Sequence, residues 1–159
     1  MRTTIASCLT FAALLAHGDA NIAQSALKSS YQKTQEMVLG GEGGWDYLAL
    51  DASARRLCIS RSTHVAVVDP DSGKEIGTIS ETPAVHGIAL APELGKGYTS
   101  CGRDRTVKVF DLRTLRQLAR IAVGTNPDAI IYEPVTRRVF TFNGGSHDGS
   151  MIDAQSGTG

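Results

Sequence analysis

The chain has 159 residues, and its 16 basic and 16 acidic residues balance to a formal net charge of zero. A nucleic-acid or anionic-membrane surface needs an excess of basic residues, so this composition favours neither partner. Aromatic residues make up 6% of the chain and glycine occurs 17 times. This balance is more typical of an all-β chain with many tight turns than of a helical bundle.

The beginning of the chain has the three-part pattern of a secretory signal peptide. A short positive start precedes an apolar stretch over residues 5–16, and Gly18 and Ala20 take the −3 and −1 positions of a cleavage site. The apolar stretch is shorter than the roughly 20 residues of a membrane-spanning helix. We therefore expect residues 1–20 to be a signal peptide, no membrane span after its cleavage, and a periplasmic or secreted protein. The alternatives are cleavage after Ala23 or Ala26 and an uncleaved N-terminal helix.

One phrase, an alternating strand closed by aspartate and a polar turn, occurs three times. The closing residues are Asp69, Asp111 and Asp153, spaced by 42 residues. A fixed period near 40 residues built from short strands is typical of propeller blades. Because an aspartate can bond the backbone two residues further on, its recurrence indicates a structural role in each turn.

The repeats cover about residues 43–79, 83–123 and 125–159, and each predicts a four-stranded antiparallel sheet. The predicted strands are 46–50, 57–60, 65–69 and 75–79, then 86–90, 97–100, 107–111 and 118–122, and finally 128–132, 139–142 and 150–153. The third repeat stops before its fourth strand, and a closed propeller needs at least about four blades. We therefore predict an all-β fold, an incomplete β-propeller of about three blades. Missing blades, or further copies of the chain, are needed to close the ring; truncation of a longer protein is favoured, because the break falls inside a repeat.

Two segments precede the first repeat. Residues 21–35 are polar and without periodicity, so we interpret them as a linker or mobile arm. Residues 36–40, Glu-Met-Val-Leu-Gly, match the ends of the later repeats and predict a lone strand at the start of the partial propeller, residues 36–159. In a complete ring this strand could be the outer strand of the last blade.

Several phrases resemble a known family. Residues 123–130 (Val-Gly-Thr-Asn-Pro-Asp-Ala-Ile), 138–143 (Arg-Val-Phe-Thr-Phe-Asn) and 65–69 (Val-Ala-Val-Val-Asp) are similar to the YVTN-type β-propeller repeats of secreted YncE-like proteins. The resemblance covers about residues 38–159 and implies an exported propeller. Many members of this family have no assigned reaction. Residues 103–112 also resemble the third strand of a WD repeat, although the Gly-His pair that opens a WD repeat is absent. Both resemblances imply the same architecture.

Cys58 and Cys101 each fall on the second predicted strand of their repeats. Neither has a cysteine or histidine at metal-finger spacing. Equivalent strands of neighbouring blades are usually too far apart for a disulfide, which needs Cα atoms within about 7 Å. We expect two free thiols that pack as small core residues, with a disulfide as the alternative.

Blade topology predicts where functional side chains gather. If the first strand of each blade lines the central channel and strand direction alternates, one face collects the starts of the inner strands. These starts are Asp46, His86 and Asp128, at equivalent repeat positions. The connections between the second and third strands add further residues to this channel mouth: Arg61, Arg103, Asp104, Asn143, His147 and Asp148.

The channel mouth admits several kinds of chemistry. Two carboxylates and an imidazole could hold calcium or another divalent metal, or serve as acid and base in hydrolysis. The simpler interpretation is that these polar groups cap strands and line a water-filled channel. His147 and Asp148 resemble half of a catalytic triad, but no serine lies in a nucleophile-elbow context, so a glycine-rich turn is the simpler interpretation. We predict no catalytic residue and no cofactor, and leave the metal content open.

Three functional hypotheses follow. The first is an exported binding propeller that uses the channel mouth for a small ligand or a protein partner. The second is a fragment of a propeller enzyme, such as a lactonase-type hydrolase or a quinoprotein-like dehydrogenase, with a metal near the mouth. The third is a fragment that is inactive alone and prone to aggregate, because its open edges invite pairing.

Overall fold

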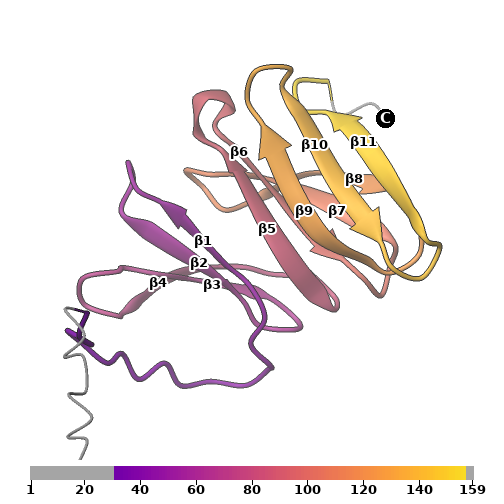
Figure 1. The fold of residues 1–159 in the computed structure, drawn as a ribbon. Helices are drawn as coiled ribbons and strands as arrows, with labels where there is room; N and C mark the ends of the chain where they lie inside the picture. The colour runs from indigo at the N-terminus through magenta and orange to yellow at the C-terminus, as the bar shows by residue number, and fades with distance from the viewer. Residues whose placement is uncertain (1–30, 157–159) are drawn as a thin grey trace, which may run out of the picture. The chain divides into compact units, whose positions relative to one another are not determined.

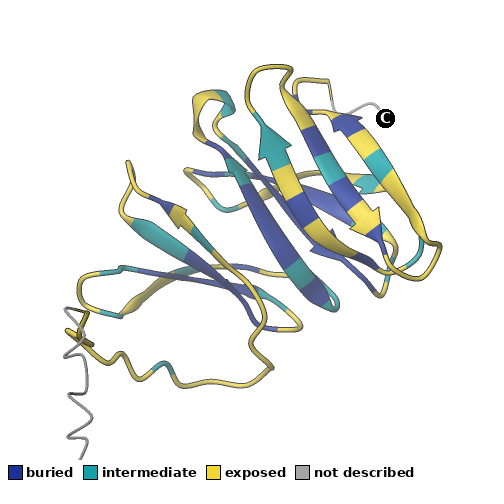
Figure 2. Cartoon of the chain, in the orientation of Figure 1, coloured by how far each residue is buried: buried dark blue, intermediate teal, exposed yellow. Residues whose placement is uncertain are grey.

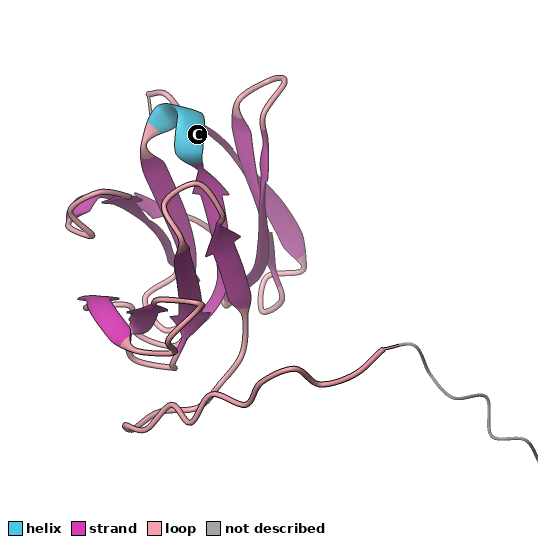
Figure 3. Ribbon diagram, turned by 90° about the vertical axis from the view of Figure 1, so that its left-hand side faces the viewer, coloured by secondary structure: helices cyan, strands magenta, loops and turns pink. Residues whose placement is uncertain are grey.

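The fold is that of a computed structural model, which describes residues 31–156 (Figure 1). The predicted signal peptide, residues 1–20, and the first part of the predicted arm lie outside the described residues. From Gln35 onward the described residues belong to one compact unit. Strands and tight turns account for its regular structure, apart from the single turn of 3-10 helix η1, Pro92–Leu94 (Figure 3).

Eleven strands form three antiparallel sheets in the described part of the chain, and within each sheet they lie in sequence order. The first sheet contains β1 (Leu48–Asp51), β2 (Arg56–Ser60), β3 (Val65–Val68) and β4 (Glu75–Ile79). The second contains β5 (Val85–Ala91), β6 (Lys96–Cys101), β7 (Thr106–Asp111) and β8 (Gln117–Ala122). The third contains β9 (Pro127–Glu133), β10 (Arg138–Asn143) and β11 (Asp148–Asp153). The all-β class and the strands within each repeat are confirmed, with boundaries shifted by one or two residues.

The first strand of each sheet lies toward the first strand of the next. β1 contacts β5, and β5 contacts β9, whereas the fourth strands β4 and β8 are largely exposed. The structure therefore has the inner-to-outer strand order predicted for blades. It also brings together the starts of the inner strands, where the candidate site lies.

Side chains alternate between the two faces of each strand, and the sheets pack through these faces. One apolar cluster joins the first sheet to the second, with Val65 and Val67 against Phe110. Another joins the second sheet to the third, with Tyr98 against Val139 and Ile152. Figure 2 shows the buried positions concentrated in the second sheet, which has a sheet on both sides. The outer faces of the first and third sheets keep exposed apolar residues.

The lone strand predicted at residues 36–40 is wrong for the described structure, where this segment has no regular secondary structure. Val38 is 91% exposed, and the segment joins none of the three sheets of the described residues. The segment instead runs beside β3 and β4, lining a groove with Ala66 and Val68. Residues 31–34, the described end of the predicted arm, also lack regular structure.

The recurring aspartates close their turns as predicted. Asp69 accepts the backbone N–H groups of residues 71 and 72 at 3.1 and 2.7 Å. Asp153 accepts those of residues 155 and 156 at 2.9 and 2.8 Å, and Asp111 accepts the N–H of Thr114 at 2.6 Å. These hydrogen bonds favour the carboxylate form and hold the pKa of all three aspartates below the usual range.

Cys58 and Cys101 are buried free thiols, as predicted. Burial raises the pKa of Cys58 to about 11, and it also raises the pKa of Cys101. Both side chains therefore act as small core residues. Among residues 31–156 no helix is long and apolar enough to cross a membrane.

Candidate functional site

The site forms where the first and second sheets meet at the starts of their inner strands. His86 is the second residue of β5, and Asp46 lies two residues before β1. His86 Nδ1 and Asp46 Oδ2 are 2.7 Å apart, and the two side chains are 28% and 47% exposed. Because a carboxylate can only accept, Nδ1 carries a proton and donates it, so that in the neutral imidazole Nε2 is an acceptor. The structure thus pairs two of the three residues predicted at the starts of the inner strands.

The local backbone explains why His86 is held in this position. The pairing of β5 with β6 shifts between Val85 and Ile88, so the start of β5 departs from a regular ladder. Val85 donates its N–H to Ser62 O at 3.0 Å, which ties the start of β5 to the β2–β3 connection of the first sheet. Next to His86, a Cβ on Gly87 would lie 2.8 Å from Asp128 O, so only glycine fits. The imidazole is therefore placed by contacts with both neighbouring sheets.

A small pocket of about 200 Å³ surrounds this pair. It is lined by Gly44, Trp45, Asp46, Ser62, Ala84, Val85 and His86. The residues supply a carboxylate, an imidazole, a hydroxyl and an indole face to one concave surface. Pockets that combine an apolar wall with a few polar groups are the usual form of a small-ligand site.

Arg61 supports the wall of this pocket and is not free to bind a ligand. It is 4% exposed, and its guanidinium lies 3.6 Å from the centre of the Trp45 ring. It also donates hydrogen bonds of 3.1, 3.2 and 3.0 Å to the carbonyl groups of Gly40, Gly41 and Glu42. The sequence places Arg61 at the mouth, but in the structure its side chain holds the Trp45 indole ring and the glycine-rich residues 40–44, the entry segment to the first sheet.

Asp128 and His147 line a different, shallower cleft of about 640 Å³ on the third sheet, together with Phe142 and Asp148. Asn143 also borders this cleft, but its side chain is buried. Its Nδ2 donates to Asp148 Oδ1 at 2.6 Å and to Ser150 Oγ at 3.0 Å. The predicted mouth residues thus divide between two places, and Asn143 stabilises the β10–β11 turn.

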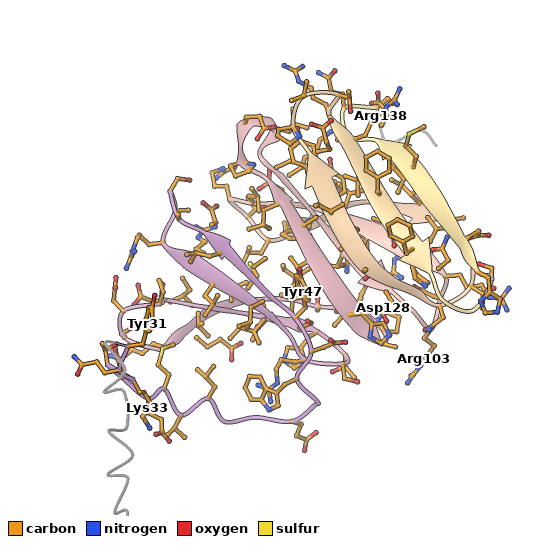
Figure 4. All side chains as sticks on the ribbon, viewed as in Figure 1. Tyr31, Lys33, Tyr47, Arg103, Asp128 and Arg138 are labelled. Atoms are coloured by element: carbon orange, nitrogen blue, oxygen red, sulfur yellow. The ribbon has the colours of Figure 1, made fainter. Side chains whose placement is uncertain are left out.

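Arg103 and Asp104 are the remaining predicted mouth residues, and neither lines either cleft. Arg103 is exposed in the β6–β7 connection, and Asp104 accepts hydrogen bonds from Thr106 and Arg120. The backbone N–H of Arg103 donates to Pro83 O at 3.3 Å. Figure 4 shows Arg103 and Asp128 at the same end of the sheets, with Arg138 at the opposite end of the third sheet. The predicted mouth residues therefore do not converge on one point.

Within the described part of the chain, no three His, Cys, Asp or Glu side chains come close enough together to hold a metal ion. Asp128 does not join the Asp46–His86 pair, so these three residues are not a ready-made ligand set. One imidazole and one carboxylate remain as potential ligands, fewer than the three protein ligands of a typical catalytic zinc site.

Two serines near the site were not recognised from the sequence. Ser60 Oγ accepts the N–H of Tyr47 at 2.8 Å and donates to His86 O at 2.7 Å, which joins the first and second sheets. Ser100 repeats the arrangement: it accepts from Gly87 N–H at 2.9 Å and donates to Asp128 O at 2.5 Å. The sequence signal that could have predicted this role is their equivalent position in successive repeats, near the end of the second strand.

No protein-family model matches the chain, and no curated protein matches it. Solved structures do resemble it. Hydrazine synthase from Kuenenia stuttgartiensis superposes with a TM-score of 0.68 and 19% identity, over 80% of this chain and 38% of that chain. U3-55K superposes with a TM-score of 0.69 and 8% identity, over 77% of this chain and 40% of that chain.

Both solved proteins contain β-propeller sheets. At these identities the likeness establishes the fold alone: three antiparallel sheets arranged as in a propeller. The matched region spans about two fifths of the length of each solved chain.

Proposed function

We propose that the protein is an exported β-propeller sector that binds a small polar ligand or a protein partner at the Asp46–His86 pocket. The signal-peptide pattern of residues 1–20 supports export. The three sheets and their inner-strand contacts support an incomplete propeller of the YVTN type, in which further blades complete the ring.

The observation that carries the proposal is the hydrogen bond between His86 and Asp46, which come from different sheets. A carboxylate that holds one nitrogen of an imidazole fixes the orientation of the ring, and the His86 ring lines the pocket. An exposed strand cap needs no such pairing across two repeats, and the third repeat, with Asp128 at this position, has none.

The pocket lining indicates the chemistry of the ligand. His86 Nε2 accepts a hydrogen bond, the Asp46 carboxylate accepts others, and the Ser62 hydroxyl does both. The Trp45 ring, fixed by Arg61, offers an apolar face. A ligand with hydroxyl or amine donors beside a small apolar face fits this arrangement.

Trp45 makes the proposal testable, because it is the only tryptophan of the chain and lines the pocket. A library of small polyols, amines and amino acids would be titrated while Trp45 fluorescence is recorded. We expect a saturable change that is lost in His86→Gln and in Asp46→Asn. Asp128→Asn is the matched control, since this aspartate lies outside the pocket, and it should keep the response. A response that survives both pocket substitutions would refute the proposal.

An enzyme fragment with a metal at the mouth is the second candidate function. The observation in its favour is the same pair, because a histidine held by a carboxylate is the usual arrangement of metal-binding imidazoles. Titration with Ca²⁺ and Zn²⁺ distinguishes the two candidates. A metal-dependent rise in melting temperature that disappears in His86→Gln would support the metal site, and unchanged melting in both salts would contradict it.

A further inference from the structure

A polar groove of about 480 Å³ lies between the first and second sheets, at the end of β2 remote from Ser60 and the candidate site. One wall comes from Ile76 and Gly77 of β4, and the other comes from residues 113–115, in the turn that follows β7. Arg56, at the start of β2, also lines the groove. The further blades proposed above pack beyond the first and third sheets, so a complete ring keeps these walls.

Arg56 is fixed beside the groove by the neighbouring sheet. Its Nη1 donates hydrogen bonds to the main-chain carbonyls of Leu112 and Arg113. A guanidinium carries five N–H groups in a rigid fork, so these contacts hold its plane and leave other donors. In the described part of the chain, no ion pair includes Arg56 or Arg113. Two cations thus line the groove without a carboxylate bound to either.

Two carboxylates lie near these arginines but outside the groove. Asp51 and Asp111 line an adjoining cleft together with Arg56 and Arg113, and neither carboxylate lines the groove. Each carboxylate also accepts hydrogen bonds from the residues of its own turn. The groove is therefore lined by two positive charges and no negative charge.

The position of Arg56 carries a cation in successive repeats for a structural reason. Lys96 begins β6 as Arg56 begins β2. Its Nζ donates to the carbonyls of Ala154 and Gln155, in the turn after β11, at 3.1 and 2.8 Å. A cation at this position thus joins one sheet to the next at both junctions.

Arg113 has no such recurring role. It follows the turn aspartate Asp111 by two residues, and the equivalent residues of the other repeats are Asp71 and Gln155. A pair of cations therefore forms at the junction of the first and second sheets, whereas the next junction has Lys96 and a neutral glutamine. A side chain that occurs in one repeat alone is available for a ligand, because the turn folds without it elsewhere.

Leu115 is a second departure from the repeat at the same groove. Its φ is 61°, a left-handed conformation that glycine adopts without steric cost and leucine does not. The first repeat has Gly73 at this position, with a φ of 69°, and the third has Gly157 in the sequence. A Cβ on Gly77 would lie 2.4 Å from Leu115 Cδ1, so the leucine packs directly on the main chain of β4. The chain thus places an apolar wall here against the local preference of the turn.

We propose that this groove binds a small organic anion, whose carboxylate or phosphate group is held by Arg56 and Arg113. Both guanidiniums offer the planar donor fork that matches two oxygens of such a group. The apolar part of the ligand lies against Leu115 and against Ile76, which is 53% exposed. This site is separate from the pocket of the candidate site and does not depend on a ligand there.

The test is a titration of the ¹⁵N-labelled full-length chain with phenyl phosphate, benzoate and inorganic phosphate, at an ionic strength held constant with sodium chloride. We expect saturable shifts of the amide signals of residues 113–115 with phenyl phosphate or benzoate, and the tighter of the two identifies the preferred oxyanion. Inorganic phosphate should bind more weakly, because it lacks an apolar part. Shifts that do not saturate, or equally tight binding of inorganic phosphate, would overturn the proposal.

Two variants locate the binding. Arg113→Gln introduces the residue that the third repeat has at this position, so the turn should fold as before. It should weaken binding about 10- to 100-fold, the effect of losing a charge-assisted hydrogen-bonding partner. Arg56→Lys keeps a cation that can bind the two carbonyls, as Lys96 does, but it loses the planar fork and should also weaken binding.

Arg116→Gln is the matched control. It removes the same charge from an exposed residue of the same turn that does not line the groove. Binding to this variant should equal binding to the unsubstituted chain. An equal loss in Arg116→Gln and Arg113→Gln would show a general effect of net charge, and unchanged affinity in Arg113→Gln would exclude the contact. Either result would overturn the proposal.

Discussion

Substitution of Ser100 by alanine should destabilise the fold at the junction of the second and third sheets. Ser100 is fully buried, and its hydroxyl bonds Gly87 N–H at 2.9 Å and Asp128 O at 2.5 Å. Alanine leaves both main-chain groups without this partner. A buried unsatisfied group costs about 1–3 kcal/mol. Gly87 is buried, so its N–H would lose its partner inside the junction, and we expect a total loss of about 2–3 kcal/mol.

For a unit of this size a loss of 1 kcal/mol lowers the melting temperature by about 3–5 °C, so Ser100→Ala should lower it by roughly 6–15 °C. Urea unfolding followed by circular dichroism measures the free-energy change directly. Ser72→Ala is the control, because this exposed hydroxyl bonds Asp69 within a surface turn and its loss should cost less than about 1 kcal/mol. A change below about 0.5 kcal/mol for Ser100→Ala would refute the assignment of a junction role to the repeated serines.

Three further predictions follow from other contacts. Hydrogen bonds from Thr114 lower the pKa of the Asp111 carboxyl in the folded state below its usual 3.8. The Asp111 carboxylate therefore stabilises the fold fully at pH values above 3.8, and this contribution is lost as the pH falls through the folded-state pKa. Urea unfolding between pH 7 and pH 3 should show this loss, and Asp111→Asn should show less of it; an identical acid response would contradict the role of the carboxylate. Cys58 is buried with a pKa of about 11, so it should resist iodoacetamide at pH 8 and react once the chain unfolds. Peptide mass mapping measures the labelling, and rapid labelling of the native protein would show that Cys58 is not a core thiol. Arg61→Met should release the entry segment, so that proteases other than trypsin cut near Glu42 faster than in the unsubstituted chain. Equal cleavage rates in the two chains would argue against anchoring by Arg61.

Most of the fold could be predicted from the repeat, and the reasons are local. Alternating apolar residues such as Val65, Val67, Val107 and Val109 define strands, and the aspartate that closes each third strand defines a turn by its own hydrogen bonds. The segment at residues 36–40 was the exception. Its sequence resembles an outer strand, but a strand exists only when it pairs with another strand, and among the described residues this segment joins no sheet.

The candidate site was harder to predict because topology places residues on a face without fixing their contacts. The approach of Asp46 to His86 followed from the equivalent positions of the two residues. The roles of Arg61 and Asn143 did not follow, since both look like mouth residues in the sequence and both are buried in the structure. A charged or amide side chain at the end of a strand can point to solvent or turn inward to bond main-chain groups, and the entry segment that decides the matter for Arg61 is 20 residues away.

Residues near the two ends of the second strand could also have been predicted to join neighbouring sheets, because they recur in successive repeats. Ser60 is the last residue of the second strand of its repeat and Ser100 the last but one, and Arg56 and Lys96 begin these strands. Both pairs proved to join sheets, because a side chain at either end of the second strand can reach the main chain of the next sheet.

The central claim is that His86, on the first strand of the second sheet, is fixed by Asp46, which lies just before the first strand of the first sheet. Nuclear magnetic resonance of ¹⁵N-labelled His86 tests this most directly, because the nitrogen shifts report which nitrogen carries the proton. The account predicts an imidazole that carries a proton at Nδ1, with a downfield proton that disappears in Asp46→Asn. An imidazole protonated at Nε2 alone, or one whose spectrum is the same in Asp46→Asn, would contradict it.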